Sequence, residues 1–280
     1  MGTGQDSLSN LPLDGRVAVV TGATGALGGA AARGLAEAGA TIGIVARSLE
    51  RAESFADELR GTGADVLVLP ADVLDEAAIA SARDSALERW GRIDILVNAA
   101  GGNLPGATVG ERSLFELPLE SFDDVVRLNL DGTLLPIRAF GAAMLEGPFP
   151  EGGRSIVNFS SMAARRAMTR VVGYGAAKAG VDNLTRWLAV ELGRASAGRL
   201  RVNAVAPGFF LGAQNRALLL DADGTPTPRG ATVLAQTPAG RFGEAGEVAG
   251  AVVWLSSASA SFVTGVVLPV DGGFDAFSGV

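Results

Sequence analysis

Short runs of branched apolar residues recur along the chain and alternate with helix-length stretches. Seven runs have the length and composition of strands: 16–20, 41–45, 66–69, 93–97, 155–159, 201–205 and 265–268. Runs that are apolar at nearly every position are typical of strands buried on both faces, and strands that alternate with helices pair in parallel. We therefore predict an α/β fold, a single-domain doubly wound parallel sheet of Rossmann-like type with helices on both faces.

The order of these elements shows no interdomain linker and no internal repeat. We expect a flexible N-terminal segment at residues 1–14 and one domain at residues 15–280. The alternation is interrupted at about 101–118 and 209–240. Because ligands bind beyond the carboxyl ends of the strands in sheets of this kind, these two stretches are predicted to be substrate loops.

Residues 248–270 carry no charge and are long enough to span a bilayer. The stretch also contains four serines and a proline, which a membrane span disfavours. We predict instead a buried helix that ends near Ser257, followed by a buried strand around residues 266–268.

Composition narrows the range of partners. The chain has 280 residues, a formal net charge of −7, no cysteine and no histidine. An acidic chain without a basic stripe is not expected to bind nucleic acid or an anionic membrane surface. Without cysteine or histidine there is no disulfide and no thiolate or imidazole ligand, and no metal site is expected. The polar first fourteen residues lack the apolar core of a secretory signal, so the cytoplasm is the expected location.

Tyr174 and Lys178 are the clearest candidates for chemistry on a small-molecule substrate. They stand four residues apart on a predicted helix, so both side chains share one face, and Tyr174 is the only tyrosine in the chain. A free phenol titrates near pH 10, and a neighbouring ammonium favours its ionised form, so the pair can move a proton at neutral pH. Ser161, a short loop upstream, can hydrogen-bond the reacting carbonyl. The alternative is a surface tyrosine and lysine on an amphipathic helix.

Glycines cluster directly after the first predicted strand and before the first predicted helix. Such a turn lets the backbone approach a pyrophosphate while the amides of the helix start point at it. The residues predicted to line this phosphate turn are Gly22, Thr24, Gly25, Ala26, Leu27 and Gly28. A glycine-rich turn without a ligand is the alternative.

The end of the second predicted strand bears on the choice of cofactor. A carboxylate there selects NAD, whereas a cation can pair with the 2′-phosphate of NADP. Ala46 occupies the place expected for the acid and Arg47 follows, which favours NADP over NAD. Arg47 could also be a solvated arginine at a helix start. After the third strand, Asp72 and Val73 could contact the adenine, or Asp72 could cap the next helix.

The ordered set of motifs resembles the short-chain dehydrogenase/reductase family over nearly the whole chain. The resemblance rests on residues 21–29, 98–101, Asn129, Ser161, Tyr174, Lys178, Asn203 and 207–208. It implies a catalytic set of Asn129, Ser161, Tyr174 and Lys178, in which Lys178 also binds the nicotinamide ribose and Asn129 positions a water. It also implies cofactor contacts along Asn98, Ala99, Gly101, Pro207 and Gly208. Asn129 could otherwise be a polar residue that kinks a helix.

Two positions depart from the family pattern. Ala26 stands where the family has a glycine of the cofactor turn, and Gly212 stands where a threonine commonly bonds the nicotinamide carboxamide. A backbone group, Gln214 or Asn215 would then replace that threonine.

The loop sequences are similar to the branch of D-mannonate oxidoreductases (fructuronate reductases), which implies a sugar acid as substrate. A sugar acid needs a cation for its carboxylate and polar partners for its hydroxyls. The candidate substrate residues are Asn103, Arg165, Arg166, Arg170, Gln214, Asn215 and Arg216. Phe209 and Phe210 could form a hydrophobic lid or ordinary packing.

Three classes of function stay open: a sugar-acid oxidoreductase, a reductase of another carbonyl such as a 3-oxoacyl thioester or a neutral ketose, and a non-catalytic nucleotide-binding protein. The catalytic set counts against the third class, and the acidic composition offers no basic patch for the acidic carrier of a thioester. The family resemblance further implies a homotetramer. Its interfaces would use the helices at 119–144 and 173–192, and residues 248–270 with the tail 274–280.

Overall fold

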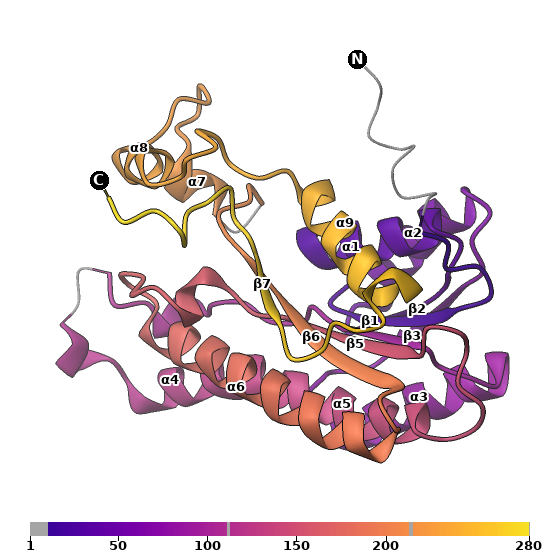
Figure 1. Ribbon diagram of the computed structural model, residues 1–280. Coiled ribbons are helices and arrows are strands. Elements are labelled where there is room, and N and C mark those ends of the chain that lie inside the picture. Colours follow the sequence, from indigo (N-terminus) through magenta and orange to yellow (C-terminus); the bar gives the residue numbers. More distant parts are fainter. Residues whose placement is uncertain (1–10, 111–112, 213–214, 280) are drawn as a thin grey trace.

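A seven-stranded parallel sheet forms the centre of the molecule (Figure 1). The computed structural model describes residues 11–110, 113–212 and 215–279. The strands are β1 (Val17–Thr21), β2 (Thr41–Ala46), β3 (Val66–Pro70), β4 (Ile95–Asn98), β5 (Arg154–Phe159), β6 (Leu200–Pro207) and β7 (Val267–Val270). Their order is β3-β2-β1-β4-β5-β6-β7, so the direction of winding reverses between β1 and β4. The predicted doubly wound sheet is confirmed, and a ligand cleft is expected at this reversal.

Helices cover both faces of the sheet (Figure 1). One face carries α1 (Ala26–Glu37), α2 (Leu49–Arg60) and α9 (Ala245–Ser256). The other face carries α3 (Glu76–Trp90), α4 (Leu119–Val126), α5 (Gly132–Met144) and α6 (Val172–Ala195). The short helices α7 (Arg216–Leu219) and α8 (Pro228–Ala235) stand beyond the carboxyl ends of the strands, within the predicted substrate loop at 209–240.

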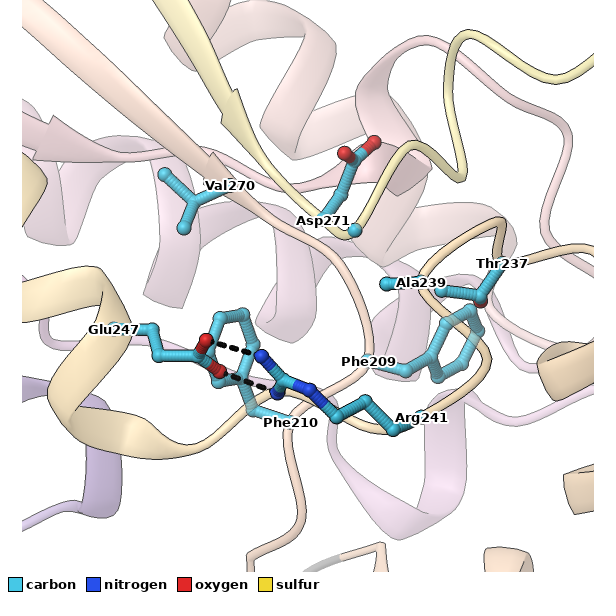
Figure 2. A pocket seen from close by; sticks show the side chains of 10 residues that line it. Phe209, Phe210, Thr237, Ala239, Arg241, Glu247, Val270 and Asp271 are labelled. Carbon is cyan, nitrogen blue, oxygen red and sulfur yellow. Dashed lines mark hydrogen bonds and ion pairs between the residues drawn. The ribbon is translucent and has the colours of Figure 1, made fainter. Parts of the chain in front are cut away.

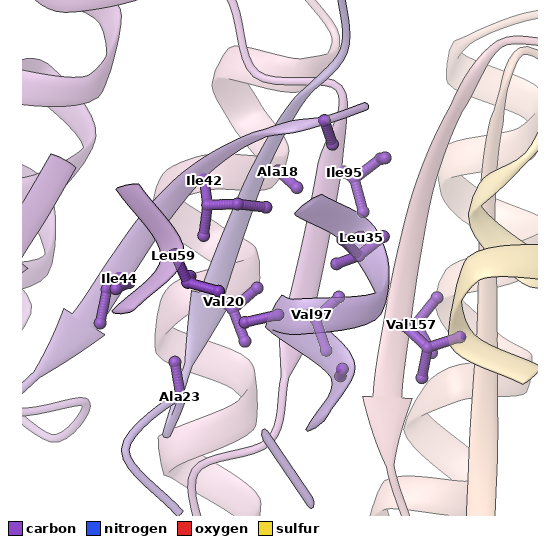
Figure 3. Close-up of a cluster of buried hydrophobic side chains, with 14 of the residues drawn as sticks. Ala18, Val20, Ala23, Leu35, Ile42, Ile44, Leu59, Ile95, Val97 and Val157 are labelled. Atoms are coloured by element: carbon purple, nitrogen blue, oxygen red, sulfur yellow. The ribbon is translucent and has the colours of Figure 1, made fainter. Parts of the chain in front are cut away.

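Two hydrophobic cores lie on opposite sides of the sheet, because successive strand residues point to opposite faces. Val20 belongs to the core under α1, α2 and α9, which Figure 3 shows, whereas its neighbour Val19 belongs to the core under α3, α5 and α6. Burying one such side chain is worth about 1.5–3 kcal/mol. Leu13, within the N-terminal segment, joins the first core with 2% of its surface exposed.

The charge-free stretch 248–270 forms the predicted helix and strand, but the strand is only partly buried. Residues up to Ser256 complete α9, and the chain returns as β7 at the edge of the sheet. In the part of the chain that the structure describes, no helix is both long and apolar enough to cross a membrane.

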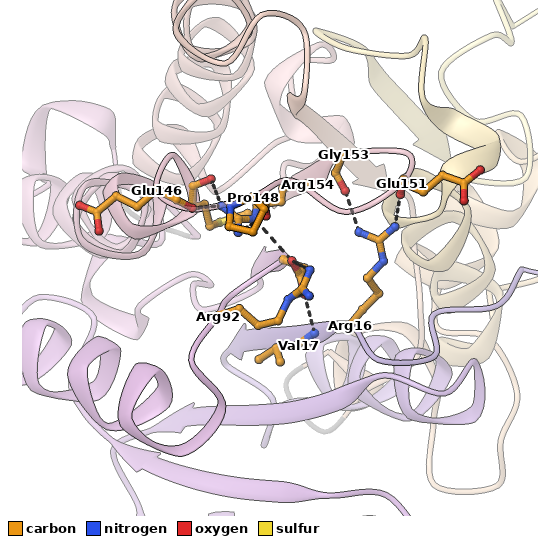
Figure 4. Close-up of polar contacts among 10 residues, drawn as sticks. Arg16, Val17, Arg92, Glu146, Pro148, Glu151, Gly153 and Arg154 are labelled. Carbon is orange, nitrogen blue, oxygen red and sulfur yellow. Dashed lines mark hydrogen bonds and ion pairs between the residues drawn. The ribbon is translucent and has the colours of Figure 1, made fainter.

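A buried ion network closes the amino ends of the strands, opposite the cleft (Figure 4). The carboxylate of Asp94 is fully buried and accepts two hydrogen bonds from Arg92, each 2.8 Å long, and one from the Val17 amide at 3.1 Å. Arg154 approaches the same carboxylate at 3.4 Å and donates to the carbonyls of Met144, Glu146 and Pro148. Every bond of this network fixes a loop or strand end, so its role is structural.

Candidate active site

An open cleft of about 580 Å³ lies at the carboxyl ends of β1, β4, β5 and β6. Of the residues predicted for cofactor, substrate or catalysis, those that line it are Gly22, Thr24, Gly25, Ala26, Leu27, Gly28, Ala99, Gly101, Ser161, Tyr174, Lys178, Pro207, Gly208 and Asn215. The fold thus brings together segments that are nearly 200 residues apart in the sequence. The cleft coincides with the reversal of strand order, as expected for a doubly wound sheet.

The glycine turn forms one end of the cleft, and its shape depends on two glycines. Gly22 has φ +69°, and a Cβ there would lie 2.6 Å from the amide nitrogen of Ala100. A Cβ on Gly28 would lie 2.4 Å from the Gly22 carbonyl oxygen. A side chain at Gly22 would push the turn away from the 99–101 segment, and a side chain at Gly28 would push the start of α1 away from the Gly22 carbonyl.

The start of α1 suits a pyrophosphate. The helix begins at Ala26, its N-cap Gly25 provides no side-chain hydrogen bond, and both residues face the cleft. Unpartnered amides at a helix start are anion-binding groups, and no acidic residue in the first turn competes with the anion. Ala26 lies inside the helix, where alanine needs no glycine-like backbone, so this departure from the family pattern leaves the cradle intact. The residues present therefore fit a dinucleotide.

Helix α6 places Tyr174 and Lys178 on the cleft wall one turn apart. The Lys178 Nζ donates a hydrogen bond of 2.7 Å to the Phe159 carbonyl and lies 5.6 Å from the centre of the Tyr174 ring. Ser161 lies two residues after the end of β5, and its Oγ accepts a hydrogen bond from the Ala163 amide at 3.1 Å, which orients the hydroxyl toward the same space. The three side chains line one continuous surface of the cleft.

Burial shifts both titrating groups of this pair. Desolvation raises the pKa of the Tyr174 phenol, and a hydrogen bond with Ser161 acts in the opposite direction. Desolvation lowers the pKa of Lys178 to about 8, and the charge of Asp182 acts against that shift. The sequence predicts that the Lys178 ammonium favours the phenolate, but burial has the larger effect on the pKa of Tyr174 in the folded chain and keeps the phenol protonated at neutral pH. It is thus in the form that can donate a proton to a carbonyl oxygen.

Asn129 lies behind the cleft wall, in a π-helical turn (Arg127–Asp131) between α4 and α5. Its Nδ2 donates to the carbonyls of Gly102 at 2.8 Å and Val125 at 2.9 Å, and its Oδ1 accepts from the Gly102 amide at 3.0 Å. A Cβ on Gly101 would lie 2.6 Å from that Oδ1. Asn129 therefore clamps the segment that faces Lys178; its role in positioning a water stays a prediction.

Asn98, Asp72 and Val73, which were predicted to lie near the adenosine, do not line the cleft. The Asn98 side chain is buried and donates to Asn158 Oδ1 at 2.9 Å, which ties β4 to β5. Val73 is buried against Gly132. Asp72 accepts from the Leu74 amide at 2.9 Å, and α3 is capped by Asp75 instead. The suggestion that Asp72 caps this helix is therefore wrong.

Two arginines bracket the outer end of the glycine turn. Arg47 is largely exposed and forms a long ion pair of 3.7 Å with Asp72. Arg51, one turn into α2, lines the cleft and donates to the Thr24 carbonyl at 3.0 Å. Arg51 is not among the residues predicted from the sequence, although its place in the first turn after the Ser48 cap could have indicated it.

The substrate candidates fall into three groups. Asn215 lines the cleft, where its amide donates to the Phe210 carbonyl and its carbonyl accepts from the Gly212 amide, both at 2.8 Å. Asn103 is tied to Thr108 at 2.8 Å and does not line the cleft. Gln214 lies outside the described residues.

The arginines near Ser161 differ in their partners. Arg165 and Arg166 both form ion pairs with Asp275 of the C-terminal tail, at 3.0 and 3.1 Å. Arg170 is exposed in the last position before the residue that caps α6, and its carbonyl accepts from the Val109 amide at 2.9 Å. Arg216 starts the exposed helix α7. None of these four guanidinium groups lines the cleft as it stands.

Packed aromatic side chains and an ion pair hold the base of the loop at 209–240 (Figure 2). Phe210 is buried, pairs with Gly243 and lines the cleft, whereas Phe209 packs edge-on against Phe274 with ring centres 5.3 Å apart. Next to them Arg241 and Glu247 form a two-bond ion pair, which lowers the pKa of Glu247 to about 2. The segment that carries α7 and α8 is therefore anchored at its base by packed side chains.

Known proteins share this fold and these motifs. The family model described as enoyl-(acyl carrier protein) reductase matches residues 22–275. The uncharacterized oxidoreductase UxuB of Bacillus subtilis is 41% identical over 278 residues, which are 96% of this chain and 98% of that protein. A structure with bound NAD, provisionally named D-mannonate oxidoreductase, from Haemophilus influenzae has a TM-score of 0.90 and 38% identity, covering 98% of this chain and 99% of its own. Gluconate 5-dehydrogenase of Burkholderia cenocepacia J2315, solved with NADP and tartrate, has a TM-score of 0.84 and 34% identity, covering 96% and 99%.

A doubly wound sheet with a glycine-rich turn and a half-buried tyrosine beside a buried lysine at one cleft is typical of an oxidoreductase that uses a nicotinamide cofactor. The chain belongs to the short-chain dehydrogenase/reductase family. It is an NAD(P)-dependent enzyme that transfers a hydride between the nicotinamide and a carbonyl or secondary alcohol.

Proposed function

We propose that the substrate is a sugar acid of the D-fructuronate/D-mannonate type and that NADP is the preferred cofactor. The observation that carries the proposal is the cleft itself, in which Ser161, Tyr174 and Lys178 face a common space and Asn215 offers a polar group. The names of two similar structures support a sugar acid as the substrate. One is provisionally a D-mannonate oxidoreductase, and the other is a gluconate 5-dehydrogenase with tartrate bound.

In the proposed reaction the substrate oxygen lies between the Ser161 hydroxyl and the Tyr174 phenol. Ser161 donates a hydrogen bond that polarises the carbonyl, and Tyr174 transfers its proton to the oxygen as the alcohol forms. Lys178 stabilises the phenolate that remains and holds the nicotinamide ribose. The cofactor, when bound in the cleft, supplies or accepts the hydride. In the oxidative direction Tyr174 takes the proton back.

The decisive experiment is a panel of sugar acids, neutral ketoses and polyols, assayed by the absorbance of reduced cofactor with NAD and NADP in parallel. We expect the highest kcat/KM for a sugar acid with NADP. A clear preference for a neutral ketose or a polyol would contradict the sugar-acid proposal and favour the alternative, a reductase of another carbonyl. If the enzyme turned over none of the carbonyl compounds or alcohols in the panel, the proposed reaction itself would be contradicted.

We expect truncation of the carboxylate partner to separate charged from neutral substrates. Asp275 already occupies Arg165 and Arg166, so Arg170 and Arg216 are the better candidates. A charge-assisted hydrogen bond is worth about 1.5–3 kcal/mol, so Arg170→Ala or Arg216→Ala should raise KM for the acid roughly tenfold or more. The KM for an uncharged analogue should hardly change. Arg165→Ala is the matched control, and if no arginine variant separates the two substrates, the sugar-acid proposal loses its physical support.

For the cofactor, we expect Arg51→Ala to raise KM for NADP at least about fivefold more than KM for NAD, because only NADP carries the 2′-phosphate that this guanidinium would pair with. Arg47→Ala should act in the same direction, but more weakly, because this side chain does not line the cleft and is already paired with Asp72. Arg60→Ala at the far end of α2, where Arg60 pairs with Glu53 and Asp57, is the control. Equal effects on NAD and NADP would show that Arg47 and Arg51 take no part in cofactor selection.

The assembly we propose is a cytoplasmic homotetramer. Large apolar side chains are exposed on the elements that the family resemblance assigns to interfaces, among them Leu119 of α4 and Trp187 and Val190 of α6. Phe262, between α9 and β7, is fully exposed. Exposed apolar groups gathered on a few elements are typical of an association surface. Light scattering at micromolar concentration tests the homotetramer, and a stable monomer would contradict it.

A further inference from the structure

A second polar layer lies directly behind the catalytic pair. Lys178, Asp182 and Ser160 are each at least 95% buried, and Asp182 follows Lys178 by one turn of α6. The Ser160 hydroxyl donates a hydrogen bond to the Asp182 carboxylate. Together with the bond from Lys178 to the Phe159 carbonyl, this bond ties α6 to two successive residues at the end of β5. The next residue is Ser161, so the layer fixes the place of the catalytic hydroxyl.

We infer that Asp182 is a positioning residue for the reaction: it holds the end of β5 through Ser160 and keeps the buried ammonium of Lys178 charged. The inference depends on Lys178 acting with Tyr174 and not on which carbonyl is reduced. A failure of the sugar-acid proposal therefore leaves it standing.

The charges around Asp182 support this role. The groups that act on its carboxylate are Ser160 by hydrogen bonding, and Arg186, Arg165 and Lys178 by charge, while burial raises its pKa. In the described part of the chain Asp182 forms no direct ion pair with Lys178, so it acts on the ammonium through its field. Asp182 is the group that opposes the effect of burial on Lys178. Without that charge the lysine would lose its proton at a lower pH.

The composition of the chain makes this inference directly measurable. Lys178 is the only lysine, since the other 22 of the 23 basic residues are arginine. An arginine stays protonated at any accessible pH, whereas a buried lysine can titrate, and the chain uses lysine only here. In protein labelled with ¹³C-lysine, a single Cε signal reports the protonation of Lys178 without substrate or cofactor.

We expect the Cε signal of the unmodified protein to titrate with a midpoint near pH 8. Asp182→Asn should move the midpoint down by about one pH unit, because a like-sized neutral group replaces the carboxylate. The alkaline limb of kcat/KM should move by the same amount. Ser160→Ala keeps the charge, so it should leave the midpoint nearly unchanged and reduce kcat roughly tenfold through misplacement of Ser161.

Glu191→Gln is the matched control, because it removes one negative charge from an exposed position about two and a half turns beyond Asp182 along α6. It should move neither the midpoint nor kcat. An unchanged midpoint in Asp182→Asn would overturn the electrostatic role, and an unchanged kcat in Ser160→Ala would overturn the positioning role. Should Asp182→Asn fail to fold, Asp182→Val removes the same charge with an apolar side chain and is subject to the same criterion.

Discussion

Replacing Tyr174 with phenylalanine should reduce kcat by on the order of a hundredfold or more and leave the fold intact. The substitution removes one hydroxyl, which is the group positioned to give its proton to the substrate oxygen. The ring, its packing on α6 and the contact with the Lys178 ammonium remain. Because the phenol is not part of the phosphate turn, the dissociation constant of the cofactor should change little.

The measurement is kcat in both directions, with cofactor binding followed by fluorescence and folding followed by thermal denaturation. Tyr174 is the only tyrosine, so the variant must also lose the alkaline phenolate absorbance of the native enzyme entirely, which verifies the preparation. Near-normal turnover would remove Tyr174 from the mechanism. A large fall in melting temperature would instead assign the loss to the fold.

Lys178→Met should produce the second large effect, a loss of kcat together with weaker cofactor binding. Methionine matches the length of the lysine stem but provides no ammonium, so the phenolate and the nicotinamide ribose lose their common partner. The hydrogen bond to the Phe159 carbonyl disappears as well, and that carbonyl stands directly before Ser160 and Ser161. We expect kcat to fall on the order of a hundredfold and the dissociation constant of the cofactor to rise roughly tenfold.

Lys178→Arg is the informative companion variant, because it keeps a positive charge. A guanidinium is planar, larger and permanently charged, and the native ammonium occupies a site that is only 3% exposed. We expect this variant to lose most of its activity too, since the site requires a compact charge at one point. If kcat falls without a change in cofactor affinity, or the reverse, the dual role of Lys178 is wrong.

The layout of the fold follows from local patterns in the sequence. The seven strands were predicted within one or two residues because apolar runs of this length are compatible with few other environments in an α/β chain. The glycine turn and the pairing of Tyr174 with Lys178 are also local: the first depends on backbone conformation at adjacent residues, and the second on a helical spacing of four. In each case the interacting groups lie within about ten residues of one another.

Contacts between distant segments could not be derived in this way. Asp275 meets Arg165 and Arg166 across more than 100 residues, so the arginines that the sequence placed beside Ser161 are already paired in the folded chain. The sequence marks Asn129 as polar, but its three hydrogen bonds to Gly102 and Val125 depend on how a π-helical turn packs against the 99–103 segment. Desolvation of Tyr174 and Lys178 likewise appears only once the cleft walls have assembled.

The sequence by itself therefore determined the fold class, the glycine-rich turn after the first strand and the spacing of Tyr174 and Lys178 on one helix face, because each depends on residues close together along the chain. Only the tertiary structure decided the charge state of that pair, the pairing of the loop arginines and the place of Ser160 and Asp182 behind the catalytic residues. Electrostatic free energy depends on burial and on the separation of charges in space, and neither quantity exists until the strands and helices have packed.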